Sequence, residues 1–223
     1  MGLKSLKMTR YTIREVQTKK DLRRFIKFPF ELYKGCDQYV PPLIKGQEHE
    51  LMHAASLKYC TRKMWLAEDE KGKVVGRICA MINPRYNEKY GTKRARFGWF
   101  DLINDMDVAK LLFDVAESWA KGEGMDEIHG PLYYNTLGRQ GMLVEGFDKL
   151  APFTCLYNYP YYVRHLDNYG LVKEADWIEY QIYPPQELPE RIARMDKIVR
   201  ERSHVRVDKV KNCKELVQKY GTQ

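Results

Sequence analysis

A chain of 223 residues with 44% hydrophobic content is long enough to bury one substantial core and part of another. Its formal net charge of +8 favours anionic ligands or partners without choosing among them. No run approaches the roughly 20 apolar residues that cross a bilayer, and the five scattered cysteines contain no C-x-x-C pair, so the sequence predicts a cytoplasmic protein without a membrane partner, a zinc ribbon or a redox dithiol.

The first predicted elements are a strand and a helix. Residues 11–16 alternate in the manner of a strand. Thr18, with Asp21 three residues later, makes a capping-box-like start for the helix that follows. Pro29 strains that helix, so residues 28–63 are predicted as short helices and loops.

The middle of the chain predicts a sheet with one crossover. Two strands, 64–69 and 73–83, are joined by a tight charged turn and form an antiparallel hairpin, and a further strand covers 95–103. Residues 107–121 predict a helix, because apolar residues recur there at helical spacing. With the short strand 126–132 it makes a βαβ unit of parallel strands, and such units bind ligands at the carboxyl ends of their strands.

Three more elements are predicted in the last third of the chain. Residues 161–169 form a short helix that ends at Gly170, and residues 175–183 alternate as a strand. A helix follows from 187 to about 202. Its row of basic residues could touch nucleic acid, although a solvated helix face is the better explanation of such a run.

An internal repeat links the two ends of the chain. Residues 13–22 return as 207–216 without a gap, so that a strand, a capping residue and a helix start recur. Thr18 and Asn212 occupy the same capping place in the two copies. We expect the second copy to begin a further domain that stops within this chain, and residues 205–223 to pack on the first domain or to fray.

The element order resembles the GNAT superfamily of acyl-CoA N-acyltransferases. Residues 73–82 look like the third-strand signature of that superfamily, and residues 162–172 look like its last helix with a glycine turn. A longer, poorly characterised bacterial branch with two such domains in tandem is similar over residues 11–183. The similarity lies in Tyr39-Val-Pro-Pro-Leu43, Phe97-Gly-Trp-Phe-Asp101, Gly130-Pro131, Gly146-Phe147 and Tyr159-Pro-Tyr-Tyr162.

This resemblance implies an α/β (α+β) fold with a mixed, mostly antiparallel sheet, one parallel βαβ crossover and helices on both faces. It implies a GNAT-like domain over residues 1–203 and the start of a truncated second repeat over 204–223. The implied reaction is the attack of an unknown amine on the thioester of acetyl-CoA or another acyl-CoA. Asp101 is then the candidate base, acting through water.

The site implied by the resemblance is altered in this sequence. The superfamily keeps a glycine-rich pyrophosphate loop where this chain has Leu102-Ile-Asn-Asp-Met-Asp-Val108, which lacks glycine and adds two acids. The tyrosine that usually protonates the leaving thiolate is replaced by Leu166, so Tyr161, Tyr162 and Tyr134 are candidate substitutes. The candidate cofactor-binding residues are Leu102, Ile103, Asn104, Met106, Asn135 and Arg139.

Other interpretations remain open. His49-Glu50-Leu51-Met52-His53 matches the H-E-x-x-H zinc motif, but no third ligand is indicated and we predict no metal site. His129 is expected to be structural. The chain could be a GNAT-fold binding module in which catalysis has lapsed, or a transferase that uses aminoacyl-tRNA. A dimer is a further alternative.

Overall fold

The computed structural model describes residues 10–135, 138–152, 155–203 and 208–221, which form two compact units. The first unit ends at Trp177 and the second begins at Ile178. The predicted boundary between residues 203 and 204 differs from this division and stays a prediction. No helix among the described residues is long and apolar enough to cross a membrane.

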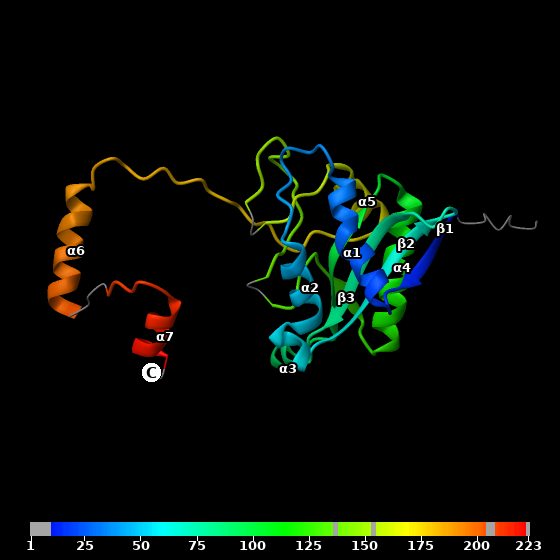
Figure 1. Cartoon of the computed structure of the whole chain (residues 1–223), viewed down its shortest axis with the longest axis horizontal. Helices are drawn as coiled ribbons and strands as arrows, with labels where there is room; N and C mark the ends of the chain where they lie inside the picture. Colours follow the sequence, from blue (N-terminus) through cyan, green and yellow to red (C-terminus); the bar gives the residue numbers. More distant parts are fainter. Residues whose placement is uncertain (1–9, 136–137, 153–154, 204–207, 222–223) are drawn as a thin grey trace, which may run out of the picture. The chain divides into compact units, whose positions relative to one another are not determined.

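The first unit is built on one five-stranded mixed sheet (Figure 1). The strand order is β1-β2-β3-β4-β5; the first three pairings are antiparallel and β4 pairs with β5 in parallel. This confirms the predicted fold class, including the hairpin and the single parallel crossover. The strands are β1 (Tyr11–Glu15), β2 (Thr61–Asp69), β3 (Val74–Ile82), β4 (Arg94–Leu102) and β5 (Glu127–His129).

Helices cover both faces of the sheet. Alternate residues of β2 separate the two faces: Trp65 packs in the core under α4 and α5, whereas Leu66 packs in the core under α1 and α2. The helices of this unit are α1 (Lys19–Leu32), α2 (Ile44–His53), the 3-10 turn η1 (Ala55–Lys58), α3 (Pro84–Tyr90), α4 (Met106–Gly122) and α5 (Tyr161–Tyr169).

Two local features of the sequence position these helices. The predicted capping box of α1 is confirmed, because Thr18 accepts from the Asp21 amide and Asp21 accepts from the Thr18 amide. Helix α4 approaches the sheet closely over Gly76, where an added Cβ would lie 2.8 Å from side-chain atoms of both Val108 and Leu112. The burial of each such apolar side chain contributes about 1.5–3 kcal/mol to the free energy of unfolding.

The predicted strand over residues 175–183 is wrong. The structure has no strand there, and Trp177, Ile178 and Tyr180 expose more than 70% of their surface. The alternating pattern is present, but a strand needs a neighbour to accept its backbone hydrogen bonds, and these residues pair with no described strand.

The second unit contains two helices, α6 (Glu190–Ser203) and α7 (Cys213–Tyr220). Helix α6 agrees with the helix predicted from 187 to about 202. Asn212 caps α7 by accepting from the Glu215 amide at 3.0 Å, which confirms the predicted parallel with Thr18. The repeat's strand begins at Val207, outside the described residues, and residues 208–212 form no strand.

Candidate functional site: a recess beside Asp101

Strand β4 contains a bulge where the sheet meets the recess. Arg77 of β3 pairs with Asp101 and Cys79 pairs with Gly98, so β4 has one residue more than β3 between these pairs. Trp99 lies in the bulge with φ 44°, a left-handed conformation that costs a non-glycine residue roughly 1–3 kcal/mol. The surrounding packing has to hold this residue in place.

The two parallel strands adjoin as predicted. Residues 94–96 of β4 pair with residues 127–129 of β5, and beyond β5 the Leu132 amide donates to the Phe97 carbonyl at 2.7 Å. The bulge at Trp99 lies further along β4, beyond the residues that pair with β5. The predicted βαβ unit of parallel strands is therefore present.

A recess opens beside the bulge and is lined mostly by aromatic and apolar side chains. Its charged lining residues are Arg77, Asp101 and Arg139. Trp99 and Tyr133 stack with ring centroids 3.6 Å apart in its wall. The other lining residues are Tyr39, Val40, Pro42, Gln47, Phe100, Pro131, Gly141, Met142, Ala151, Cys155, Leu156, Tyr157, Asn158 and Tyr162.

Asp101 is the centre of a buried hydrogen-bond network. Arg77 donates from Nε to Asp101 Oδ2 at 2.7 Å, and Tyr33 donates to Oδ1 at 3.1 Å. The hydroxyls of Tyr33 and Tyr162 lie 2.9 Å apart, and the Leu102 amide donates to the Tyr162 oxygen at 3.1 Å. We call Asp101, Arg77, Tyr33 and Tyr162 the Asp101 network.

The direction of each hydrogen bond in the Asp101 network follows from its donors. An ionised carboxylate only accepts, so Tyr33 uses its single proton on Asp101, and Tyr162 has to donate to the Tyr33 oxygen. Burial is the main cause that raises the pKa of both tyrosines well above the usual value, and the Asp101 carboxylate adds to it. Both phenol protons are therefore held inside the network, which leaves Tyr162 without a free proton for a leaving group.

Arg77 is fixed by a second contact that Pro29 makes available. Because proline has no N–H, the Phe25 carbonyl four residues earlier in α1 has no helical donor. Arg77 Nη1 donates to this carbonyl at 2.8 Å, and its guanidinium lies over the Phe25 ring. Burial is the largest single influence on the pKa of Arg77 and would lower it, but Asp101, Tyr133 and Tyr39 together outweigh burial and raise that pKa. Helix α1 thus continues past Pro29 to Leu32, where the sequence had predicted an interruption.

Arg139 is the second cation of the recess. It forms no ion pair or hydrogen bond within the described part of the chain. Burial raises the pKa of the neighbouring Glu50, and the charge of Arg139 acts against that rise. Gln47 links Glu50 of α2 to Trp99 of β4: its side chain donates to Glu50 at 3.1 Å and accepts from Trp99 Nε1 at 2.8 Å. The fold therefore brings Arg139 to the same recess as Asp101 and Tyr162, which were predicted from separate motifs.

Hydrogen bonds within the chain occupy polar groups at the first turn of α4. Asp105 caps the helix by accepting from the Asp107 amide at 2.9 Å, and Tyr11 donates to the second oxygen of Asp105 at 2.8 Å. The Ile103 amide donates to the Val75 carbonyl. A pyrophosphate would meet two carboxylates here, and the amides of Ile103 and Asp107 already have acceptors. These residues do not fit the phosphates of acyl-CoA.

Helix α5 covers the end of β4. Tyr161 donates to the Leu102 carbonyl at 2.7 Å, while the Leu102 amide is used by Tyr162. Both backbone polar groups of Leu102 are therefore occupied. A ligand that extends along this strand end would have to displace the two tyrosines.

Three other predicted cofactor-binding residues lie outside the recess lining. Asn104 hydrogen-bonds His165 Nε2 at 3.1 Å, and Met106 packs against the core at the start of α4. Asn135 accepts from the Gly138 amide at 3.0 Å and so caps a turn. The structure thus separates these residues from Asp101 and Arg139, and their cofactor role stays a prediction.

The remaining histidine and tyrosine candidates also lie apart from the Asp101 network. His49 and His53 are neighbours on α2, but no cluster of three potential metal ligands occurs among the residues that the structure describes. His129 lies 3.6 Å from Glu174, and burial lowers the pKa of its imidazole. Tyr134 is buried next to Trp99.

Two members of the Asp101 network were missed by sequence reasoning. Arg77 carried a signal, because it is the one charged residue of a nine-residue strand. Tyr33 carried none, since it is one of 16 tyrosines in the chain and lies in a segment without clear periodicity.

No protein-family model matches the chain. The chain is 34% identical over 169 residues to Protein YghO of Escherichia coli (strain K12), an alignment that covers 75% of this chain and 43% of that protein. The chain therefore spans less than half the length of this relative.

Several solved structures are similar at low sequence identity. A predicted acetyltransferase from Clostridium acetobutylicum, in a structure with acetyl-CoA, is 12% identical, with a TM-score of 0.46 over 77% of this chain and 96% of that one. Glucosamine-6-phosphate N-acetyltransferase from Arabidopsis thaliana is 11% identical, with a TM-score of 0.45 over 78% and 99%. The strand order of the sheet, its single parallel pair and the helices on both faces are those that the sequence resemblance implied. The chain therefore has the mixed α/β fold that this resemblance implied.

Proposed function

We propose that this GNAT-fold domain binds a small ligand with an anionic group, such as a carboxylate, in the recess beside Asp101. The observation that supports this is the difference between the two cations of the recess. Arg77 is neutralised by Asp101, whereas Arg139 has no partner among the described residues. An arginine offers a planar pair of donors that suits a carboxylate or phosphate.

The walls of the recess favour a ligand with an apolar or aromatic body. Tyr39 and Val40 are partly exposed and provide apolar surface, and the amide of Asn158 is already used by the backbone of Leu143. Apolar walls with one free charged group are typical of sites for small molecules. The ligand would place its anion on Arg139 and its body against Tyr39.

Binding can be tested by a thermal-shift screen of amino acids, dicarboxylates and phosphoserine, followed by calorimetry of whatever raises the Tm. We expect Arg139→Ala to abolish the shift and Arg139→Lys to retain part of it, because lysine keeps the charge without the planar fork. Lys149→Ala is the matched control, since it removes an exposed cation outside the recess lining. An unchanged affinity in Arg139→Ala would contradict the proposal.

A second candidate is N-acyl transfer from acyl-CoA to an amine. It is favoured by the position of Asp101 at the carboxyl end of β4, where the family resemblance implies a base. The closed first turn of α4 argues against it, so we expect acetyl-CoA and longer acyl-CoAs to give no heat of binding at millimolar concentration. Saturable binding of acetyl-CoA would make acyl transfer the better proposal, and Asp101→Asn would then be tested for loss of turnover at retained binding.

A further inference from the structure

A second groove lies on the outer side of α1, where the helix passes the start of β3. It shares no lining residue with the recess beside Asp101. Five of its eight lining residues are cations and one is an acid. They are Lys20, Arg23, Arg24, Lys27, Phe28, Glu31, Lys73 and Val74.

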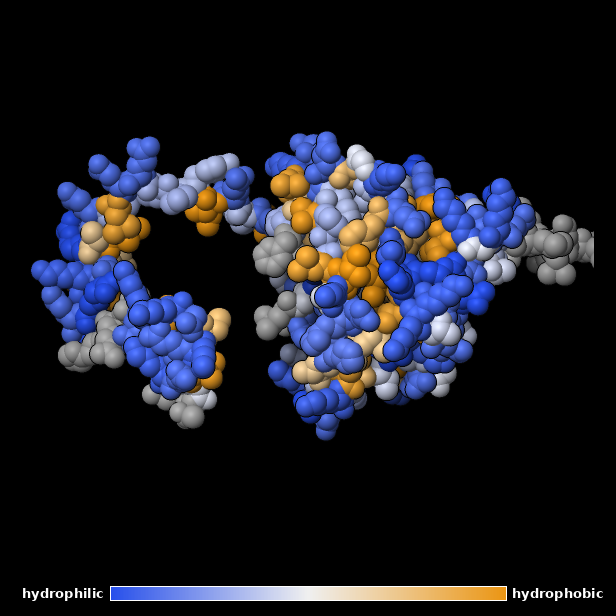
Figure 2. Space-filling model, viewed as in Figure 1, coloured by the Kyte–Doolittle hydropathy of each residue, from blue (hydrophilic) through white to orange (hydrophobic). Residues whose placement is uncertain are grey.

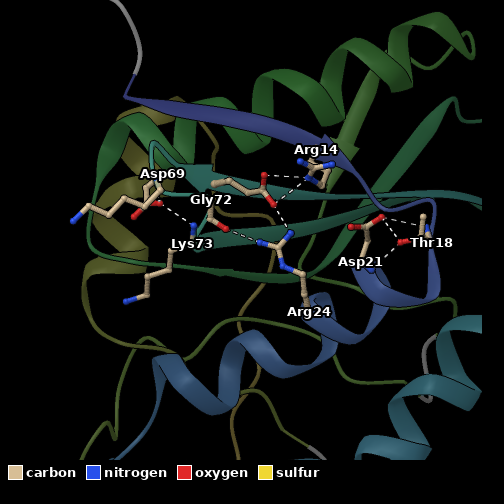
Figure 3. A network of polar contacts seen from close by, with 9 residues as sticks. Arg14, Thr18, Asp21, Arg24, Asp69, Gly72 and Lys73 are labelled. Atoms are coloured by element: carbon tan, nitrogen blue, oxygen red, sulfur yellow. Dashed lines mark hydrogen bonds and ion pairs between the residues drawn. The ribbon is translucent and has the colours of Figure 1, made fainter.

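One side of this groove is held in place by Arg24. Arg24 forms an ion pair with Glu68 and donates to the Gly72 carbonyl at 2.7 Å, which ties α1 to the turn between β2 and β3 (Figure 3). Arg14 forms a second ion pair with Glu68 at 3.1 Å. The carboxylate of Glu68 is buried and faces two guanidinium groups, so it does not neutralise the rest of the groove.

The other four cations of the groove are free to meet a ligand. Lys20, Arg23, Lys27 and Lys73 are exposed, and none forms an ion pair with a residue that the structure describes. The three on α1 are spaced i, i+3 and i+7, which puts them on one helix face. Figure 2 shows strongly hydrophilic residues gathered over the region that α1 and β2 occupy in the same view of Figure 1.

We propose that this groove binds the phosphate backbone of a single-stranded nucleic acid. Lys20 and Lys27 lie about 10 Å apart along the helix axis at 1.5 Å per residue, a distance greater than that between neighbouring phosphates, so the row can face more than one phosphate. The row is open and linear, unlike a closed cage around one phosphate. Phe28 is the aromatic residue of the lining and it is buried, so bases would not stack and binding would not depend on sequence.

The test is fluorescence anisotropy of a labelled 20-nucleotide single strand with the full chain, measured across a series of salt concentrations. The variant is Lys20→Gln, Lys27→Gln and Lys73→Gln combined, which leaves Arg24 and its contacts intact. The matched control is Lys45→Gln, Lys93→Gln and Lys149→Gln combined, which removes the same charge from exposed lysines outside the groove. Circular dichroism establishes that both variants are folded.

We expect wild type and control to bind with a salt-dependent affinity. In the groove variant the slope of log affinity against log salt should fall by about 0.7 for each lysine removed. Equal losses in variant and control would show that only the net charge matters and would overturn the proposal, as would salt-independent binding. Binding of inorganic polyphosphate with no binding of the oligonucleotide would also overturn it, in favour of a small phosphorylated ligand.

Discussion

At the scale of single residues, the pair formed by Arg77 and Asp101 connects the core to the recess. Both side chains are almost fully buried and hydrogen-bond each other. Arg77 also donates to the Phe25 carbonyl, and Asp101 also accepts from the Tyr33 hydroxyl. A buried ion pair adds little compared with apolar residues of the same shape, but removal of one partner leaves a buried charge without compensation. The difference in stability between removing one partner and replacing both is measurable.

We predict that Arg77→Met lowers the free energy of unfolding by about 3–5 kcal/mol, because the Asp101 carboxylate loses its only neutralising cation within the Asp101 network and the Phe25 carbonyl loses its donor. Combining it with Asp101→Leu should recover much of this loss, since no isolated charge then remains. Urea unfolding monitored by tryptophan fluorescence gives both values. A single substitution that costs less than about 1 kcal/mol would mean that water reaches the pair.

At the scale of secondary-structure elements, most of the sheet and its helices could be predicted from local pattern. β1, the hairpin, α4 and α5 carry alternation, helical spacing or caps that do not depend on distant residues. The strand expected over residues 175–183 failed because alternation does not reveal whether a neighbour is present. Helix α1 ran on past Pro29 because the carbonyl that the proline frees is bonded by Arg77, which is 52 residues away from Phe25 in sequence.

The candidate site depends even more on contacts between residues that are distant in sequence. Asp101, Tyr162 and Arg139 were named from motifs, and the structure places them around one recess. Their hydrogen bonds could not be predicted, because the network depends on Tyr33 and Arg77 arriving from α1 and β3. The absence of glycine before α4 was visible in the sequence, whereas the contact that Tyr11 makes to Asp105 was not.

At the scale of the whole molecule, the buried core belongs to the first unit. The three core clusters and the apolar residues packed against them extend no further than Leu171. In the second unit no residue of α6 or α7 is buried, and Ile192, Met195 and Val217 expose about half of their surface or more. The two units should therefore differ sharply in stability.

We predict that a chain ending at Trp177 unfolds cooperatively with a Tm within about 2 °C of the full chain, a difference of less than roughly 1 kcal/mol at this size. The reason is that none of the residues described beyond Trp177, 178–203 and 208–221, has a buried apolar side chain. Differential scanning calorimetry of both chains measures the difference, and limited proteolysis should cut the full chain first beyond Trp177. A loss of many degrees on truncation would show that α6 or α7 covers part of the first unit, and the exposed apolar residues of those helices would then be the contact to examine by substitution.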